Sequence, residues 1–100
     1  MTQTIEDTDT DTGLAALEDL SQALTRRGHL TMMVTAGGRP RLEVLHRTEP
    51  GRSGTIVCER DTDGEAWFWW TWADRIAPAR ELEQAAVLVD RSLRQAPGAA

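Results

Sequence analysis

The chain has 100 residues, enough for one small domain, and its 40% apolar and 27% charged residues are typical of a globular protein. No apolar run is long enough to cross a bilayer, the first residues lack the basic and apolar regions of a signal peptide, and a net charge of −5 argues against a general nucleic-acid binder. A single cysteine excludes an internal disulfide, and no cluster of cysteine and histidine suggests a zinc site. We therefore expect a cytoplasmic protein with no metal and no cofactor.

Residues 1–12 form an acidic leader in which threonine alternates with acids. The leader holds Glu6, Asp7, Asp9 and Asp11 and no basic residue. Because it has little apolar surface to bury, we expect it to be disordered. The rest of the chain is close to neutral, and a near-neutral domain has little charge repulsion against self-association.

Residues 13–27 are predicted to form the first helix of a single domain that spans residues 13–95. Leucines recur at spacings of three and four, which is the period of one helix face. These leucines are Leu14, Leu17, Leu20 and Leu24. Gly28 follows as a residue suited to a left-handed helix stop.

Four strands are predicted next, at residues 30–35, 41–47, 55–60 and 66–72. The connections are too short to hold a crossover helix, so the strands should form an antiparallel meander. The segment Asp61-Thr62-Asp63-Gly64 is typical of a hairpin turn between the last two strands.

A second helix is predicted over residues 79–93, with Pro78 in its first turn and a disordered tail at residues 96–100. The fold class is therefore α+β, in the order α-β-β-β-β-α. Two helices side by side cover the width of a four-stranded sheet, so we expect both on one face and the other face open to water.

Alternation along the strands assigns side chains to the two faces. The predicted inner face holds Leu30, Met32, Val34, Leu42, Val44, Ile56 and Cys58. The predicted outer face holds Thr31, Met33, Thr35, Arg41, Glu43, Leu45, Val57 and Glu59, with Leu45 and Val57 as neighbours in its middle.

The last predicted strand, WFWWTW, has two possible registers, because a shift of one residue exchanges the faces. A three-residue hairpin loop with Gly64 left-handed turns Phe68, Trp70 and Trp72 inward and Trp67 and Trp69 outward, and we favour it. A loop of even length does the reverse. Either register leaves aromatic side chains on the open face.

An exposed apolar and aromatic patch commonly marks a binding surface, and tryptophan is enriched at interface hot spots. We predict that the partner-binding residues are Met33, Leu45, Val57, Trp67 and Trp69. The alternative is that a loop or the leader covers this face.

The layout also resembles a known group of proteins. A leucine-rich helix, Arg27-Gly28, short strands and WFWWTWADRIAP leading into an alanine-rich helix are similar to small uncharacterised proteins of high-GC Gram-positive bacteria, over residues 14–94. This resemblance implies no activity and no functional residue. The layout is also loosely similar to the secretion-chaperone-like fold, whose members bind other proteins and often dimerise, by analogy of fold alone.

Three smaller motifs have weaker functional interpretations. His46 and Cys58, if diagonal on adjacent strands, would offer a base and a nucleophile, although a cysteine facing a core is commonly a small apolar residue. Gly37-Gly38-Arg39 is typical of a turn more than of an anion site. The alternating acids Asp61, Asp63 and Glu65 lack the later ligands of a calcium loop.

The sequence thus predicts a non-enzymatic protein-binding module that self-associates or binds a protein client through its open, aromatic-rich sheet face. We expect no nucleic-acid partner and no membrane partner. The alternative is a small-ligand or enzymatic pocket between helices and sheet, built on His46 and Cys58.

Overall fold

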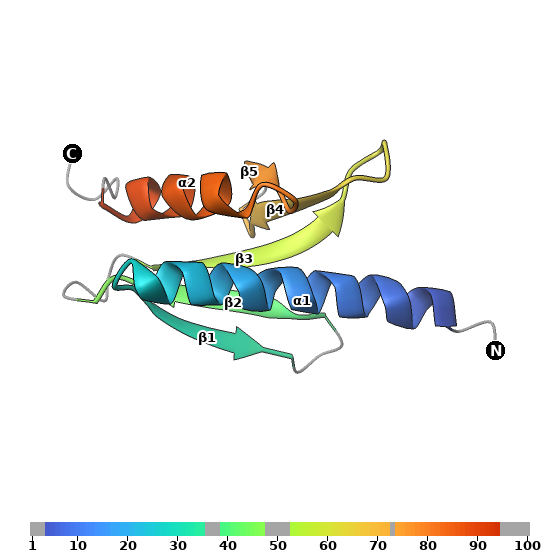
Figure 1. Cartoon of the computed structure of the whole chain (residues 1–100), viewed down its shortest axis with the longest axis horizontal. Helices are drawn as coiled ribbons and strands as arrows, with labels where there is room; N and C mark the ends of the chain where they lie inside the picture. Colours follow the sequence, from blue (N-terminus) through green and yellow to red (C-terminus); the bar gives the residue numbers. More distant parts are fainter. Residues whose placement is uncertain (1–3, 36–38, 48–52, 73, 95–100) are drawn as a thin grey trace.

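The computed structural model describes residues 4–35, 39–47, 53–72 and 74–94, in which two helices pack on a five-stranded antiparallel sheet (Figure 1). The elements are α1 (Thr4–Arg26), β1 (Leu30–Val34), β2 (Arg41–Leu45), β3 (Ser53–Arg60), β4 (Ala66–Trp70), β5 (Arg75–Pro78) and α2 (Leu82–Arg94). The strands lie in the order β1-β2-β3-β4-β5, so each pairs with its neighbours in sequence. The predicted α+β class and antiparallel meander are confirmed.

The fifth strand was not expected. Arg75–Pro78 pairs with β4 through Trp69↔Arg75 and Phe68↔Ala77, with an irregular step between Phe68 and Trp69. Pro78 is accommodated because it ends an edge strand, where no further ladder donor is needed. It therefore does not begin a helix, and α2 starts at Leu82 instead of residue 79.

The first helix is also longer than predicted. We expected a disordered leader to residue 12 and a helix from residue 13, but α1 already begins at Thr4. The end of α1 agrees better with the prediction: Gly28 has a φ of 95° and its N–H bonds to the Thr25 carbonyl. The predicted disordered tail, residues 96–100, lies outside the described residues.

One hydrophobic core joins both helices to one face of the sheet. Leucines of α1, alanines and Val89 of α2 and alternate residues of β2, β3 and β4 all belong to it. The buried members are Leu17, Leu20, Ala23, Leu24, Leu42, Val44, Ile56, Phe68, Trp70, Ile76, Ala77, Ala85, Ala86, Val89 and Leu93. Both helices therefore pack side by side on this inner face, as Figure 1 shows.

The largest inward side chain, Trp70, needs a glycine beside it. A Cβ on Gly54 would lie 2.3 Å from Cζ3 of Trp70, far inside van der Waals contact. Gly54 pairs with Val44 in β2 and lies next to Ile56 of the same face. The indole thus fills the space that the missing side chain leaves, and only 6% of Trp70 is exposed.

We expect Gly54→Ala to lower the free energy of unfolding by about 1–3 kcal/mol, because the buried indole has to move to make room for the methyl group. Gly13→Ala is the matched control, since its Cβ would meet only ordinary contacts at 3.6 Å or more and alanine favours the helix. Urea denaturation of both variants measures the difference. Equal stability of the two variants would contradict the packing described.

Candidate functional site

The β3–β4 hairpin fixes which side chains of β4 face outward. The Asp61 N–H bonds to the Glu65 carbonyl, the Gly64 N–H bonds to the Asp61 carbonyl, and Gly64 has a φ of 85°. The loop inside this closing pair has three residues, as in the favoured prediction. Phe68 and Trp70 are consequently buried on the inner face.

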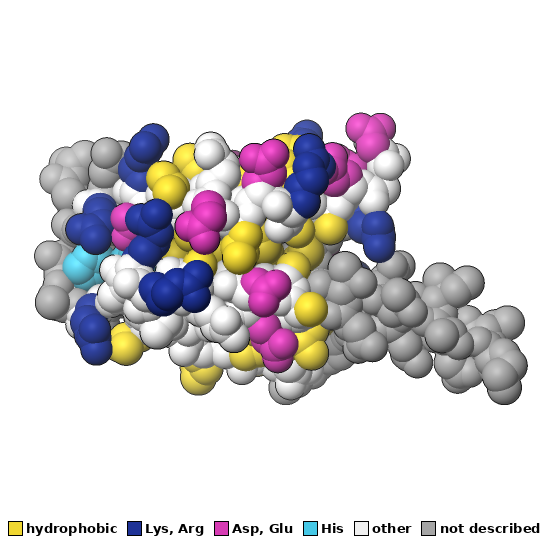
Figure 2. Space-filling view, viewed as in Figure 1, with side chains coloured by type: hydrophobic (Ala, Val, Ile, Leu, Met, Phe, Trp, Pro, Cys, Tyr) yellow, Lys and Arg dark blue, Asp and Glu magenta, His cyan; other side chains and the backbone are white. Residues whose placement is uncertain are grey.

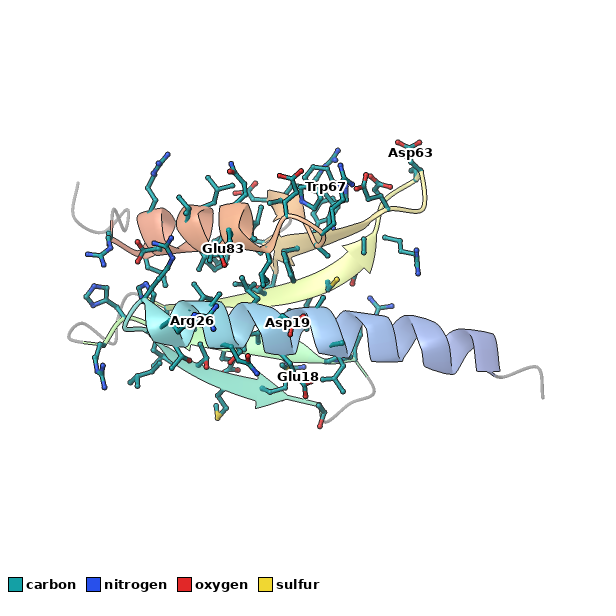
Figure 3. All side chains as sticks on the ribbon, in the orientation of Figure 1. Glu18, Asp19, Arg26, Asp63, Trp67 and Glu83 are labelled. Carbon is teal, nitrogen blue, oxygen red and sulfur yellow. The ribbon has the colours of Figure 1, made fainter. Side chains whose placement is uncertain are left out.

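Trp67 and Trp69 point to the opposite face, which we call the outer face. Trp69 pairs with Val57, and Trp67 pairs with Glu59. Figure 3 shows Trp67 beside β5, on the side of the molecule away from α1. The prediction for Trp72 is wrong: it lies past the end of β4, is 56% exposed, and stacks on Trp70 with ring centroids 4.7 Å apart.

Arg75 covers the two outward indoles. Its guanidinium carbon lies 4.6 Å from the ring centroid of Trp67 and 5.5 Å from that of Trp69. Both rings are half-buried, and their Nε1 atoms are shielded from solvent with no acceptor among the described residues. We call Val57, Trp67, Trp69 and the covering Arg75 the tryptophan patch.

Leu45 does not belong to this patch, contrary to the prediction that it neighbours Val57. It pairs with Ser53, four residues before Val57, which is about 13 Å along the strand. The polar pair Glu43 and Thr55 lies between them. Leu45 and Val57 are apart because the β2–β3 register places Ser53 opposite Leu45 and Gly54 opposite Val44. This register also places Gly54 on the inner face, where it leaves room for Trp70.

The faces of β1 are the reverse of the prediction. Thr31 faces α1, where its hydroxyl shares a 2.7 Å hydrogen bond with Ser21 and a 3.3 Å hydrogen bond with Thr25. Met33 consequently packs against the core from the inner face and is not an outer-face contact. Met32 takes the outward place with Leu30.

A second apolar area therefore lies at the other end of the outer face. Leu30 pairs directly with Leu45, and Met32 lies on the same side of β1. Leu30 is 49% exposed and Met32 is 54% exposed. We call Leu30, Met32 and Leu45 the β1 patch. The face that the sequence predicted as one patch is thus two patches with a polar row between them.

His46 and Cys58 do not form a pair. Continuing the β2–β3 register places Cys58 opposite Pro40, six residues from His46, which is about 20 Å along a strand. Cys58 packs against the core, and burial raises the pKa of its thiol, although Arg60 partly opposes this shift. The strand pairing therefore does not bring His46 and Cys58 together as a base and a nucleophile.

The sequence did not predict an ion-pair cluster around Asp90, which includes the buried His29. His29 is only 5% exposed, and its Nε2 lies 2.6 Å from Oδ1 of Asp90 in α2. Asp90 also accepts hydrogen bonds from Nε of Arg94 at 3.0 and 3.1 Å, and Arg27 lies 3.5 Å away. The cluster ties the end of α1 to α2. Only the pair of Asp90 and Arg94 could be predicted from the sequence, because these two residues are one helical turn apart.

The environment of Asp90 sets its ionisation. Burial alone would raise the pKa of its carboxyl, but hydrogen bonds from His29 and Arg94 outweigh burial and hold the pKa below its ordinary value. His46 lies against His29, with ring centroids 6.0 Å apart. Nδ1 of His29 is buried and has no hydrogen-bond partner among the described residues.

The remaining candidate motifs have structural explanations where the structure describes them. No group of three or more His, Cys, Asp or Glu side chains in this part of the chain is placed to hold a metal ion. The Asp61 carboxylate accepts hydrogen bonds from the N–H groups of Asp63 and Glu65, as a turn requires. Charges of both signs are scattered over the helix side (Figure 2). Gly37 and Gly38 lie outside the described residues.

Comparison of the chain with protein-family models, with curated proteins and with solved structures gave no match. Neither helix, within the described ranges, combines the length and the apolar composition that a membrane-crossing helix needs.

We expect Arg75→Ala to make Trp67 and Trp69 more accessible to acrylamide quenching and to lower the free energy of unfolding by about 0.5–1 kcal/mol, because the cation–π contact is lost. Arg91→Ala, which removes an exposed arginine of α2, is the control. Quenching that is the same in both variants would show that Arg75 does not cover the indoles.

We expect Asp90→Asn to cost about 1–3 kcal/mol of unfolding free energy at neutral pH, because a mostly buried, charge-assisted cluster loses its acceptor charge. Since the folded state lowers the pKa of Asp90, its contribution is present above the ordinary carboxyl pKa and is lost as the pH falls through the lowered value. Denaturation curves of wild type and variant should therefore converge below about pH 4. Asp19→Asn, on the exposed side of α1, is the control, and a difference that does not change with pH would contradict the assignment.

Proposed function

We propose that the chain is a non-enzymatic protein-binding module that self-associates through the tryptophan patch on its outer sheet face. The observation that carries this proposal is the position of Val57, Trp67 and Trp69. They form half-buried apolar surface on the face opposite the core, where neither helix packs. A second copy of the chain is the partner to which we commit.

The composition of the patch supports an interface. Tryptophan and arginine are the residues most enriched at interface hot spots, and here Arg75 lies over both indoles. The stacked guanidinium is itself a flat surface that a partner can contact. The patch thus presents anchors that are already ordered before binding, which reduces the entropy lost on association.

Charge on the outer face favours a second copy. Arg39, Arg41 and Arg75 lie among Glu43 and Glu59, and Arg39 forms an ion pair with Glu59, so the described part of this face carries charges of both signs along neighbouring strands. In a two-fold interface each residue meets a different residue of the other copy, so a face with charges of both signs complements itself. A strongly charged face would repel its own copy.

The two indole N–H groups give a further reason for association. A buried donor without an acceptor costs about 1–3 kcal/mol, and Nε1 of both Trp67 and Trp69 is in this state among the described residues. Carbonyl or carboxylate groups of a second copy that contacts the patch beside the stacked Arg75 would supply acceptors to these donors. Association would then relieve a cost that the single chain bears.

We expect Trp69→Glu to lower the weight-average mass measured by light scattering across a concentration series, because the substitution places a charge in the centre of the patch. Gln84→Glu adds the same charge on the exposed side of α2 and should leave the mass unchanged. Circular dichroism and thermal melting are the controls that test whether each variant is folded. A folded Trp69→Glu variant with the mass of the wild type would overturn the proposal.

A further inference from the structure

The two edges of the sheet differ in how they are protected from pairing. At β5 the edge strand has only four residues, carries Arg75, ends in Pro78 and follows an irregular step in the ladder. Short length, charge, proline and bulges are the devices that keep edge strands from pairing with other chains. The β5 edge has all four.

The β1 edge lacks the charge, the proline and the irregular step, and at five residues it is one residue longer than β5. Its sequence, Leu30-Thr31-Met32-Met33-Val34, contains no charge and no proline, and its pairing with β2 is regular over all five residues. Thr31 and Met33 face α1 and the core, while Leu30 and Met32 point outward and are about half exposed. Among the described strands only β2 pairs with β1, which is terminal in the sheet.

We propose that β1 is a second interaction surface, at which it pairs antiparallel with β1 of another copy of the chain. The pairing has a two-fold axis at Met32, so that Met32 stands opposite Met32 and Leu30 opposite Val34 of the other copy. The two sheets then become one continuous sheet. Backbone hydrogen bonds supply the affinity in such edge-to-edge addition.

The strand itself argues for a second copy as the occupant. On either side of Met32, each outward residue of β1 in one copy lies opposite an outward apolar residue of β1 in the other copy. No charged side chain of β1 opposes a like charge across the axis, and the domain after the leader is nearly neutral. The two β1 strands are therefore equal in length, and no like charges face each other between them.

The apolar area around the edge adds to the match. Leu45 pairs with Leu30 inside each copy, so the β1 patches of both copies join across the axis. Each patch is exposed in the single chain and gains a neighbour of the same kind in the dimer. Side chains next to the axis thus add apolar burial to the backbone pairing.

This inference goes beyond the proposed function because it uses a different surface. The tryptophan patch lies on β3, β4 and β5, and its nearest strand, β3, is two strand spacings from β1, which is about 10 Å. A substitution in one surface therefore leaves the other intact. When both surfaces are used, the wild-type mass should exceed that of two copies at high concentration.

The test uses the full chain with Trp69→Glu, so that only the edge remains for association, and light scattering as the measurement. Met32→Lys or Met32→Glu in this background places like charges opposite each other at the axis, and either variant alone should dissociate at least tenfold more readily. A mixture of the two variants should restore the dimer, because opposite charges then meet. Gln84→Lys, on the exposed side of α2, is the control.

Restoration of the dimer in the mixture also shows that both Met32 variants are folded. A dimer that Met32→Lys leaves intact, or a mixture that stays monomeric, would overturn the inference. A Trp69→Glu chain that is monomeric at every concentration would overturn it too, while the proposed function would stand. Wild-type mass unaffected by Trp69→Glu but reduced to a monomer by Met32→Lys would support the edge and reject the tryptophan patch.

Discussion

The close contact between Trp70 and Gly54 is possible in only one alignment of β3 and β4, the alignment that the turn between them also favours. The indole needs a position without a side chain on the neighbouring strand, and Gly54 provides it. Gly54 also lies opposite Val44 of β2, so the indole, Gly54 and Val44 share the inner face. Because side chains alternate along a strand, the same alignment directs Val57 and Trp69 outward. The packing of the core therefore sets which side chains lie on the outer face.

Local signals in the sequence predicted the parts of the fold that depend on neighbouring residues. The loop before β4 is closed by Asp61, Glu65 and the left-handed Gly64, so the register of β4 followed from the turn type. The leucine spacing of α1 likewise identified the buried side of the helix. In both cases the determining residues lie within a few positions of each other, which is why sequence patterns predicted them.

Features that depend on distant residues were missed or misplaced. The face of β1 is set by hydrogen bonds from Thr31 to α1, and nothing within β1 distinguishes Met32 from Met33. The fifth strand is too short to show alternation, and its proline is equally typical of a helix start. The His29–Asp90 contact joins residues 61 positions apart. Of the predicted site, Val57, Trp67 and Trp69 lie together, Leu45 lies apart, and Met33 faces the core.

The short strand β5 serves both faces of the sheet. Ala77 is buried in the core, whereas Arg75 covers the outward indoles. Four residues therefore contribute to the stability of the domain on one face and to the exposure of the tryptophan patch on the other. Partial release of this edge strand would uncover the patch while loosening the core beside α2. Substitutions in β5 are thus subject to two constraints: they must fit the core on one face and keep Trp67 and Trp69 covered on the other.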